Sequence, residues 1–91
     1  MKTVYKYHLL IEDNFTLSLP KGYQVLQVAV QKRPGVEIPC LWVLVDPEAE
    51  LTPVNFRCAG TGYDITETNL THIGTVLLYD DELVLHYFIN N

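Results

Sequence analysis

Pro39-Cys40-Leu41-Trp42-Val43-Leu44-Val45-Asp46-Pro47 is the segment from which the fold of this chain can be read. Six of the seven residues between its two prolines are apolar, and so are both of its alternating faces. The run is too short to span a membrane, and the prolines that bound it break helices. A short continuous apolar run is typical of a strand that is covered on both sides. We therefore expect a central strand that carries the only tryptophan, with shorter one-sided strands packed around it.

Six further segments alternate apolar and polar residues, as half-buried strands do. They are the ranges 3–11, 15–19, 24–31, 54–58, 73–79 and 83–89. In the third strand of the chain we expect Leu26 and Val28 on one face and Gln27 on the other. No segment has a helical period, although 65–71 could hold one helical turn. The pattern predicts one all-β domain, residues 1–91, that is a small sandwich or barrel of about seven short, mostly antiparallel strands.

The composition is that of a folded, acidic globular chain. Hydrophobic residues make up 48% of it, the net charge is -5 and the pI is about 4.9. This balance argues against a nucleic-acid binder held by phosphate neutralisation. Met1 to Ile11 alternates polar and apolar residues and lacks the continuous apolar core of a secretory signal, and no run is as long as a membrane helix. We therefore expect a cytoplasmic protein.

The best local candidate for ligand binding is the segment Arg57-Cys58-Ala59-Gly60-Thr61-Gly62-Tyr63. Its two glycines can bend the backbone so that successive N–H groups converge on an anion. Arg57 could contact a phosphate, and the Tyr63 ring could stack on a base. The alternative is that the glycines only supply turn φ angles after a strand. The tentative ligand site comprises Arg57, Gly60, Thr61, Gly62, Tyr63 and His72.

The longest connections, 46–53 and 60–71, and the short loop 80–82 hold most of the acidic residues. Loop acids are usually only solvated. As a functional alternative, an acidic surface can imitate phosphates and block a basic site on another protein. The tentative protein-interaction residues are Glu48, Glu50, Asp80, Asp81 and Glu82.

The histidines and cysteines form no recognisable motif. No H-x-x-x-H or C-x-x-C spacing links His8, His72 or His86 to one another or to the cysteines. Cys40 and Cys58 lie inside predicted strands with no nearby basic group to make either a thiolate. We therefore expect no metal, no cofactor and no enzymatic activity. A hydrolase with a cross-sheet Cys/His pair is the remaining enzyme hypothesis.

Four tyrosines lie on strands near the two chain ends: Tyr5, Tyr7, Tyr79 and Tyr87. If the terminal strands are sheet edges, these rings and the unpaired backbone groups could form a homo-oligomer interface. The alternative use of such rings is core packing. The pattern leaves open a structural or assembly accessory protein that oligomerises through edge strands.

Three segments together resemble a family of short proteins encoded by bacteriophages and prophages: residues 2–7, residues 36–47 around Pro39-Pro47, and Arg57-Gly62 continuing to His72-Thr75. The resemblance implies a bacterial cytoplasm during infection and a host-directed role. Our leading hypothesis is a non-enzymatic binding protein of phage type. It would counter host defence by sequestering a nucleotide signal or by blocking a defence protein, without contacting nucleic acid or a membrane.

Overall fold

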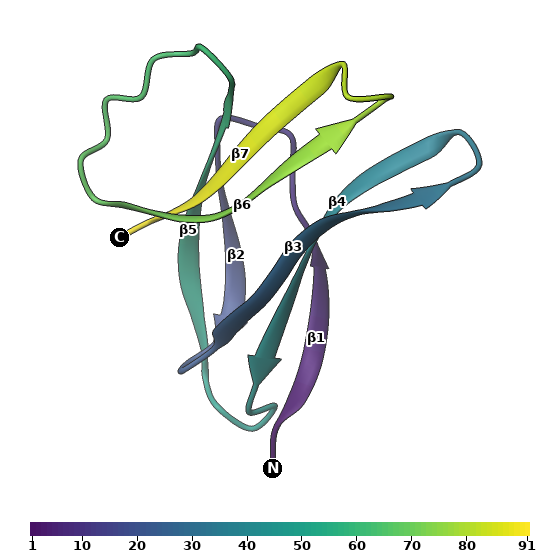
Figure 1. Ribbon diagram of the computed structural model, residues 1–91. Coiled ribbons are helices and arrows are strands. Elements are labelled where there is room, and N and C mark those ends of the chain that lie inside the picture. The colour runs from purple at the N-terminus through teal and green to yellow at the C-terminus, as the bar shows by residue number, and fades with distance from the viewer.

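The computed structural model describes residues 1–91 and contains seven strands and no helix. The strands are β1 (Thr3–His8), β2 (Asn14–Pro20), β3 (Gln24–Arg33), β4 (Val36–Val45), β5 (Leu51–Gly60), β6 (Leu70–Leu78) and β7 (Leu83–Asn90). Every pairing is antiparallel, in one sheet of order β1-β4-β3 and another of order β2-β5-β7-β6. Figure 1 shows the two sheets. The predicted all-β sandwich is confirmed, and the helical turn expected in 65–71 is absent.

The core lies between the inner faces of the two sheets. Leu41 and Val43 of β4 are fully buried against Phe56 of β5 and Tyr87 of β7. Phe15 of β2 stacks on Phe56, with ring centroids 5.2 Å apart. None of the elements is a helix long and apolar enough to cross a membrane.

The central strand β4 is covered by the other sheet on one face only. Leu41 and Val43 point into the core, whereas Trp42 and Leu44 on the opposite face are half-buried. The expectation that both faces would be covered therefore holds for Cys40, which is buried on the Trp42 face, and is wrong for Trp42 and Leu44. A two-layer sandwich supplies one partner sheet, so the outer face of β1-β4-β3 has no layer of this chain above it.

A β-bulge changes the expected orientation of one residue in β3. Val25 pairs with Val43 and Gln27 pairs with Trp42, so Leu26 is an extra residue in this strand. The bulge places Leu26 on the outer face, where it is 48% exposed. Leu26 therefore does not share a face with Val28, which packs against the core.

The two sheets approach closely where β3 meets β6. Gly74 lies at this contact, after a second bulge, between His72 and Gly74. A Cβ atom on Gly74 would come within 2.6 Å of the Cβ of Val28. Only glycine, which has no side chain, leaves room for the two strands at this distance. Gly74 therefore allows the two sheets to pack closely at this side of the sandwich.

The connections on either side of β5 are shorter than the pattern predicts. The predicted loop 46–53 is only the turn 46–50, because β5 already begins at Leu51. Proline lacks the backbone N–H that a strand donates to its neighbour. Pro53 is tolerated in β5 because β7 pairs with β5 only from Phe56 onward, so no carbonyl of β7 loses a hydrogen bond. The long connection 61–69 joins β5 to β6, which flank β7, and it arcs outward at the upper left of Figure 1.

Candidate functional site

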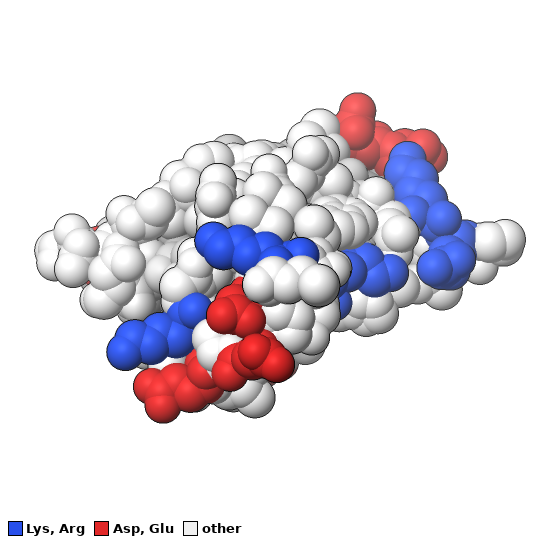
Figure 2. Space-filling model, turned by 90° about the horizontal axis from the view of Figure 1, so that it is seen from below, with Lys and Arg blue, Asp and Glu red and all other residues white.

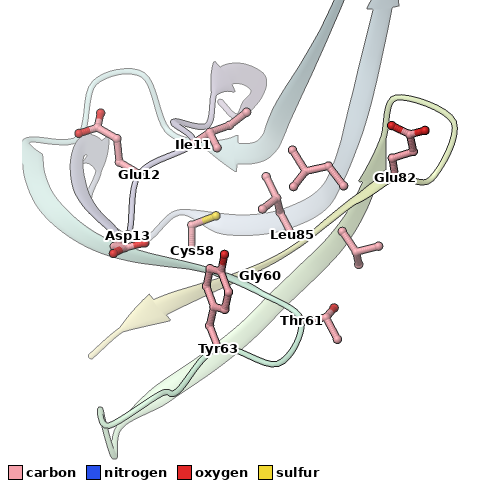
Figure 3. A pocket seen from close by; sticks show the side chains of 11 residues that line it. Ile11, Glu12, Asp13, Cys58, Gly60, Thr61, Tyr63, Glu82 and Leu85 are labelled. Carbon is pink, nitrogen blue, oxygen red and sulfur yellow. The ribbon is translucent and has the colours of Figure 1, made fainter.

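A cleft of about 350 Å³ opens at the end of the sandwich where three connections meet. Its walls come from the β1–β2 connection (9–13), from the turn at residues 60–63, and from the β6–β7 turn with the first residues of β7. Figure 3 shows Tyr63 with its hydroxyl directed toward Cys58, between the acids of the β1–β2 connection and Glu82 on the far side. We call this feature the acid-rimmed cleft.

The floor of the acid-rimmed cleft is apolar and its rim is acidic. Leu85 and Cys58 are buried core residues that form part of the floor. Glu12, Asp13 and Glu82 are exposed on the rim, and no lysine or arginine lines the cleft. Carboxylates beside a low-dielectric wall focus a negative potential in the opening. The cleft therefore suits a ligand with a cationic head and an apolar stem. Its negative potential repels a phosphate.

The glycines of the predicted ligand segment serve a tight turn. The Tyr63 N–H donates to the Gly60 carbonyl at 3.3 Å, and Gly62 has a φ of +89°. A positive φ at the third position of such a turn is the conformation that favours glycine. Tyr63 is 74% exposed and its ring packs over Gly60. Gly60, Thr61 and Tyr63 line the cleft, whereas Gly62 does not.

Arg57 lies on the outer face of β5 and is only 9% exposed. Its Nη1 donates to the carbonyls of Cys58 (2.6 Å) and Asp13 (3.3 Å), and its Nη2 donates to the carbonyl of Asp64 (3.3 Å). Its Nε lies 2.8 Å from Oε2 of Glu67. The guanidinium that was expected to contact a phosphate is thus occupied by the chain itself. It ties the connections that carry two walls of the acid-rimmed cleft to the sheet.

His72 lies outside the acid-rimmed cleft and reaches it only through a chain of hydrogen bonds. Its Nε2 is 3.0 Å from the Thr75 hydroxyl, which is 2.9 Å from Nδ1 of His86. Nε2 of His86 is 2.7 Å from the hydroxyl of Thr61 on the cleft wall. A neutral imidazole donates at one nitrogen and accepts at the other, so His86 can bridge the two threonines in either tautomer. The sequence pattern did not single out His86 for this position.

The acids expected to form one interaction surface lie at two ends of the molecule. Glu82 is on the rim of the acid-rimmed cleft, next to the exposed Asp80 and Asp81. Glu48 and Glu50 lie on the β4–β5 turn at the bottom of Figure 1. Basic side chains stand among the acids at that end, as Figure 2 shows. The two groups of acids cannot contact one small partner together, and only the Glu82 group adjoins a cleft.

The floor thiol of the cleft is held in its protonated form. Burial raises the pKa of Cys58, and burial together with the nearby Cys58 also raises the pKa of Tyr87. The Tyr87 hydroxyl donates to the Leu10 carbonyl at 3.0 Å. A protonated thiol is a poor nucleophile, so the geometry gives Cys58 the role of an apolar floor residue.

The second cysteine faces the outside of the other sheet. Cys40 is fully buried, and its Sγ lies 3.5 Å from the Ile38 carbonyl and 3.9 Å from Oε1 of Gln31. His8 is its cross-strand neighbour in β1, without a hydrogen bond to the thiol. Both cysteines are free, and no three side chains of the metal-binding types come together.

The four strand tyrosines are distributed between core and surface. Tyr87 is fully buried and Tyr7 is half-buried, whereas Tyr5 and Tyr79 are 39% and 49% exposed. The first strand, β1, is a sheet edge, but the last strand, β7, lies between β5 and β6. The surface expected from two terminal edge strands therefore exists at the β1 edge alone.

Comparison with known proteins finds a family model that covers the whole chain. Residues 1–91 match the model of a family described as Domain of unknown function (DUF7352). The chain belongs to this family. No curated protein and no solved structure matches it. The DUF7352 match gives the family without a reaction, a ligand or a partner, so any function has to be argued from the site.

The sequence pattern missed much of the acid-rimmed cleft. Glu12 and Asp13 read as a simple turn cluster, and Ile11 as the end of a strand. Their place in the cleft depends on how β1 of one sheet passes to β2 of the other, which local periodicity does not report. The one available signal was that acids follow both the first strand and the sixth strand directly.

Proposed function

We propose that this protein is a non-enzymatic binding protein whose acid-rimmed cleft receives a basic side chain of a protein partner. The observation that carries the proposal is an apolar floor with Glu12, Asp13 and Glu82 on the rim, where Asp13 Oδ1 lies 3.9 Å from Nη1 of Arg57 and the other two acids have no basic partner. The stem of an arginine or lysine covers apolar surface while its charged head stays near water and carboxylates. Such a group matches the cleft in both of these properties.

Between the two ligand classes expected from the sequence, the charge of the cleft favours the protein. A nucleotide would bring phosphates to three carboxylates, and Arg57, the cation meant to receive them, is bonded to the chain. Opposite charge across an interface steers encounter and selects partners, whereas like charge suppresses binding. In the phage-type role that the sequence resemblance suggests, the partner is a host defence protein whose basic site is blocked.

Titration with defined probes tests the proposal. We would titrate the protein by calorimetry with a capped peptide of alternating arginine and leucine, and in parallel with a cyclic dinucleotide and ADP-ribose. We expect the peptide alone to bind, and its affinity to fall steeply with salt, because exposed charges are screened beyond about 10 Å at 0.1 M salt. Heat from a nucleotide and none from the peptide would refute the proposal.

Matched variants locate the contact. Neutralising the rim with Glu12→Gln, Asp13→Asn and Glu82→Gln should weaken peptide binding by about tenfold, since each exposed pair contributes a fraction of a kcal/mol. Glu48→Gln with Glu50→Gln removes acids at the opposite end and should leave the affinity unchanged. Equal losses in the two variants would show a non-specific effect of net charge and would contradict a site in the cleft.

A further inference from the structure

The turn at residues 60–63 places an aromatic ring in the wall of the acid-rimmed cleft. The Tyr63 N–H donates to the Gly60 carbonyl at 3.3 Å, and a Cβ on Gly60 would lie 3.6 Å from Cδ2 and Cε2 of the ring. One side of the ring therefore rests on the backbone of the turn, which fixes its position. The side chain is nevertheless 74% exposed, so most of the ring is open to a ligand in the cleft.

The ring stands among carboxylates. Figure 3 shows Glu12 and Asp13 on one side of Tyr63 and Glu82 on the far side of the cleft. The face of an aromatic ring carries a negative partial charge and attracts a cation that lies over it. Ring and carboxylates thus favour a ligand of the same sign of charge, although they contact different parts of it.

Hydrogen-bond acceptors surround the cleft on more than one wall. Glu12 and Glu82 are on the rim, and neither forms an ion pair within the chain. The hydroxyl of Thr61 lies 2.7 Å from Nε2 of His86. Whichever of the two donates this hydrogen bond, the Thr61 oxygen keeps at least one free lone pair. A ligand with several N–H donors therefore finds an acceptor on each side.

These features distinguish between the two basic side chains. An arginine guanidinium is planar, carries five N–H donors in a rigid fork and stacks on aromatic faces. It can lie on a ring and, in its own plane, donate to carboxylates around that ring. A lysine ammonium is compact and strongly hydrated and has three donors. Lysine gains from the negative potential of the cleft, but it makes little use of the ring.

We propose that the acid-rimmed cleft selects arginine over lysine, with the guanidinium stacked on Tyr63 and hydrogen-bonded to the carboxylates of the rim. This inference rests on the proposed function, since it concerns the same cleft and the same protein partner. It assigns the choice between the two basic residues to Tyr63, whereas the acids supply the attraction that both would experience. The ring that the sequence analysis assigned to a nucleotide base thus receives a planar cation.

Two peptides that differ only in the basic residue test the inference. One is the capped peptide of alternating arginine and leucine, and the other carries lysine at every arginine position. By calorimetry at one salt concentration, we expect the arginine peptide to bind about fivefold more tightly, which is the size of a cation–π contact at an exposed site. The lysine peptide should still bind, because the negative potential of the rim acts on any cation.

Variants of Tyr63 locate the preference. Tyr63→Leu should bind the two peptides equally, whereas Tyr63→Phe keeps the ring and should keep the roughly fivefold preference. Tyr5→Leu is the matched control, because Tyr5 is 39% exposed on β1 and does not line the cleft. This variant should leave both affinities unchanged.

Proton NMR of the bound arginine peptide gives a second readout. A ring stacked on the guanidinium shifts the neighbouring Cδ protons of arginine upfield, and this shift should be absent in Tyr63→Leu. Equal affinities of the two peptides for the wild type, or a preference that survives in Tyr63→Leu, would overturn the arginine site. The proposed function would then still hold if neutralising the rim weakened both peptides. No heat from either peptide would overturn both proposals.

Discussion

Arg57 Nε lies 2.8 Å from Glu67 Oε2 beneath the connection that joins β5 to β6. The contact is an ion pair by distance, although the N–H does not point well enough for a hydrogen bond, and Oε1 of Glu67 has no partner. Both side chains are largely buried, at 11% and 22% exposure. A connection without regular structure is thus held to the sheet mainly by one cation, which also anchors the β1–β2 connection.

Replacing this cation should loosen both connections. Arg57→Ala should lower the free energy of unfolding by roughly 2–4 kcal/mol, because it removes the cation beside the partly buried Glu67 carboxylate and the donor to the carbonyls of Cys58 and Asp64. Chemical denaturation measures the loss, with Arg33→Ala, on the exposed β3–β4 hairpin, as the control that should change stability by less than about 0.5 kcal/mol. Equal stability of the two variants would contradict the anchoring role.

The contact between β3 and β6 should not tolerate a side chain on Gly74. Gly74→Ala places a Cβ 2.6 Å from the Cβ of Val28, and the resulting strain should cost about 1–3 kcal/mol. Gly60→Ala is the control, since its Cβ would meet only the Tyr63 ring at an ordinary 3.6 Å. Thermal melts of the two variants compare them directly. If Gly74→Ala is no less stable than Gly60→Ala, then β3 and β6 leave room for a side chain at Gly74, and the close contact with Val28 is contradicted.

The turn between β6 and β7 depends on a carboxylate from the other sheet. Tyr79, Asp80 and Asp81 all have positive φ, and the Tyr79 N–H donates to both oxygens of Glu37 at 3.1 and 3.0 Å. Glu37→Ala should therefore cost about 1–2 kcal/mol, while Glu37→Gln, which keeps one acceptor, should cost less than half of that. Hydrogen exchange of the Tyr79 amide reports the same bond. Unchanged amide protection in Glu37→Ala would contradict this account.

Stability should fall at alkaline pH. Burial raises the pKa of the Tyr87 hydroxyl above its ordinary value of 10.0 and that of the Cys58 thiol above 9.0, so the folded state holds these protons more tightly than the unfolded chain. This contribution is complete below about pH 9 and is lost as the pH rises, by at most about 1.4 kcal/mol per unit for each group. We expect a loss on the order of 1–3 kcal/mol between pH 8 and pH 11.

Denaturant midpoints across that range, measured for the wild type and for Tyr87→Phe, test the assignment. Tyr87→Phe lacks the hydroxyl that donates to Leu10 and should start less stable at pH 8 by about 1 kcal/mol. It should then lose less stability than the wild type as the pH rises. A wild type that becomes more stable toward pH 11, or two parallel curves, would show that Tyr87 is not the group responsible.

The acid-rimmed cleft shows why only part of the site was accessible to sequence reasoning. The turn 60–63 was recognisable because glycine spacing reports backbone conformation locally. Arg57 was expected to face a ligand. Its guanidinium instead contacts residues 13, 58, 64 and 67 of the chain itself, and the sequence pattern does not show that these residues lie around it. The acids at positions 12 and 13 join Glu82 only when strands of different sheets are brought together.

The set of strands and the all-β class follow from local sequence patterns, because alternation with period two and turn residues act over a few positions. The same patterns show that β4 is central, through its continuous apolar run. Which face of β4 meets the core depends on the packing of the two sheets and could not be read from the pattern, since Leu41 and Trp42 belong to equally apolar faces. A two-layer sandwich has one interior, so one of these faces had to remain outside, and the bulge at Leu26 adds to it.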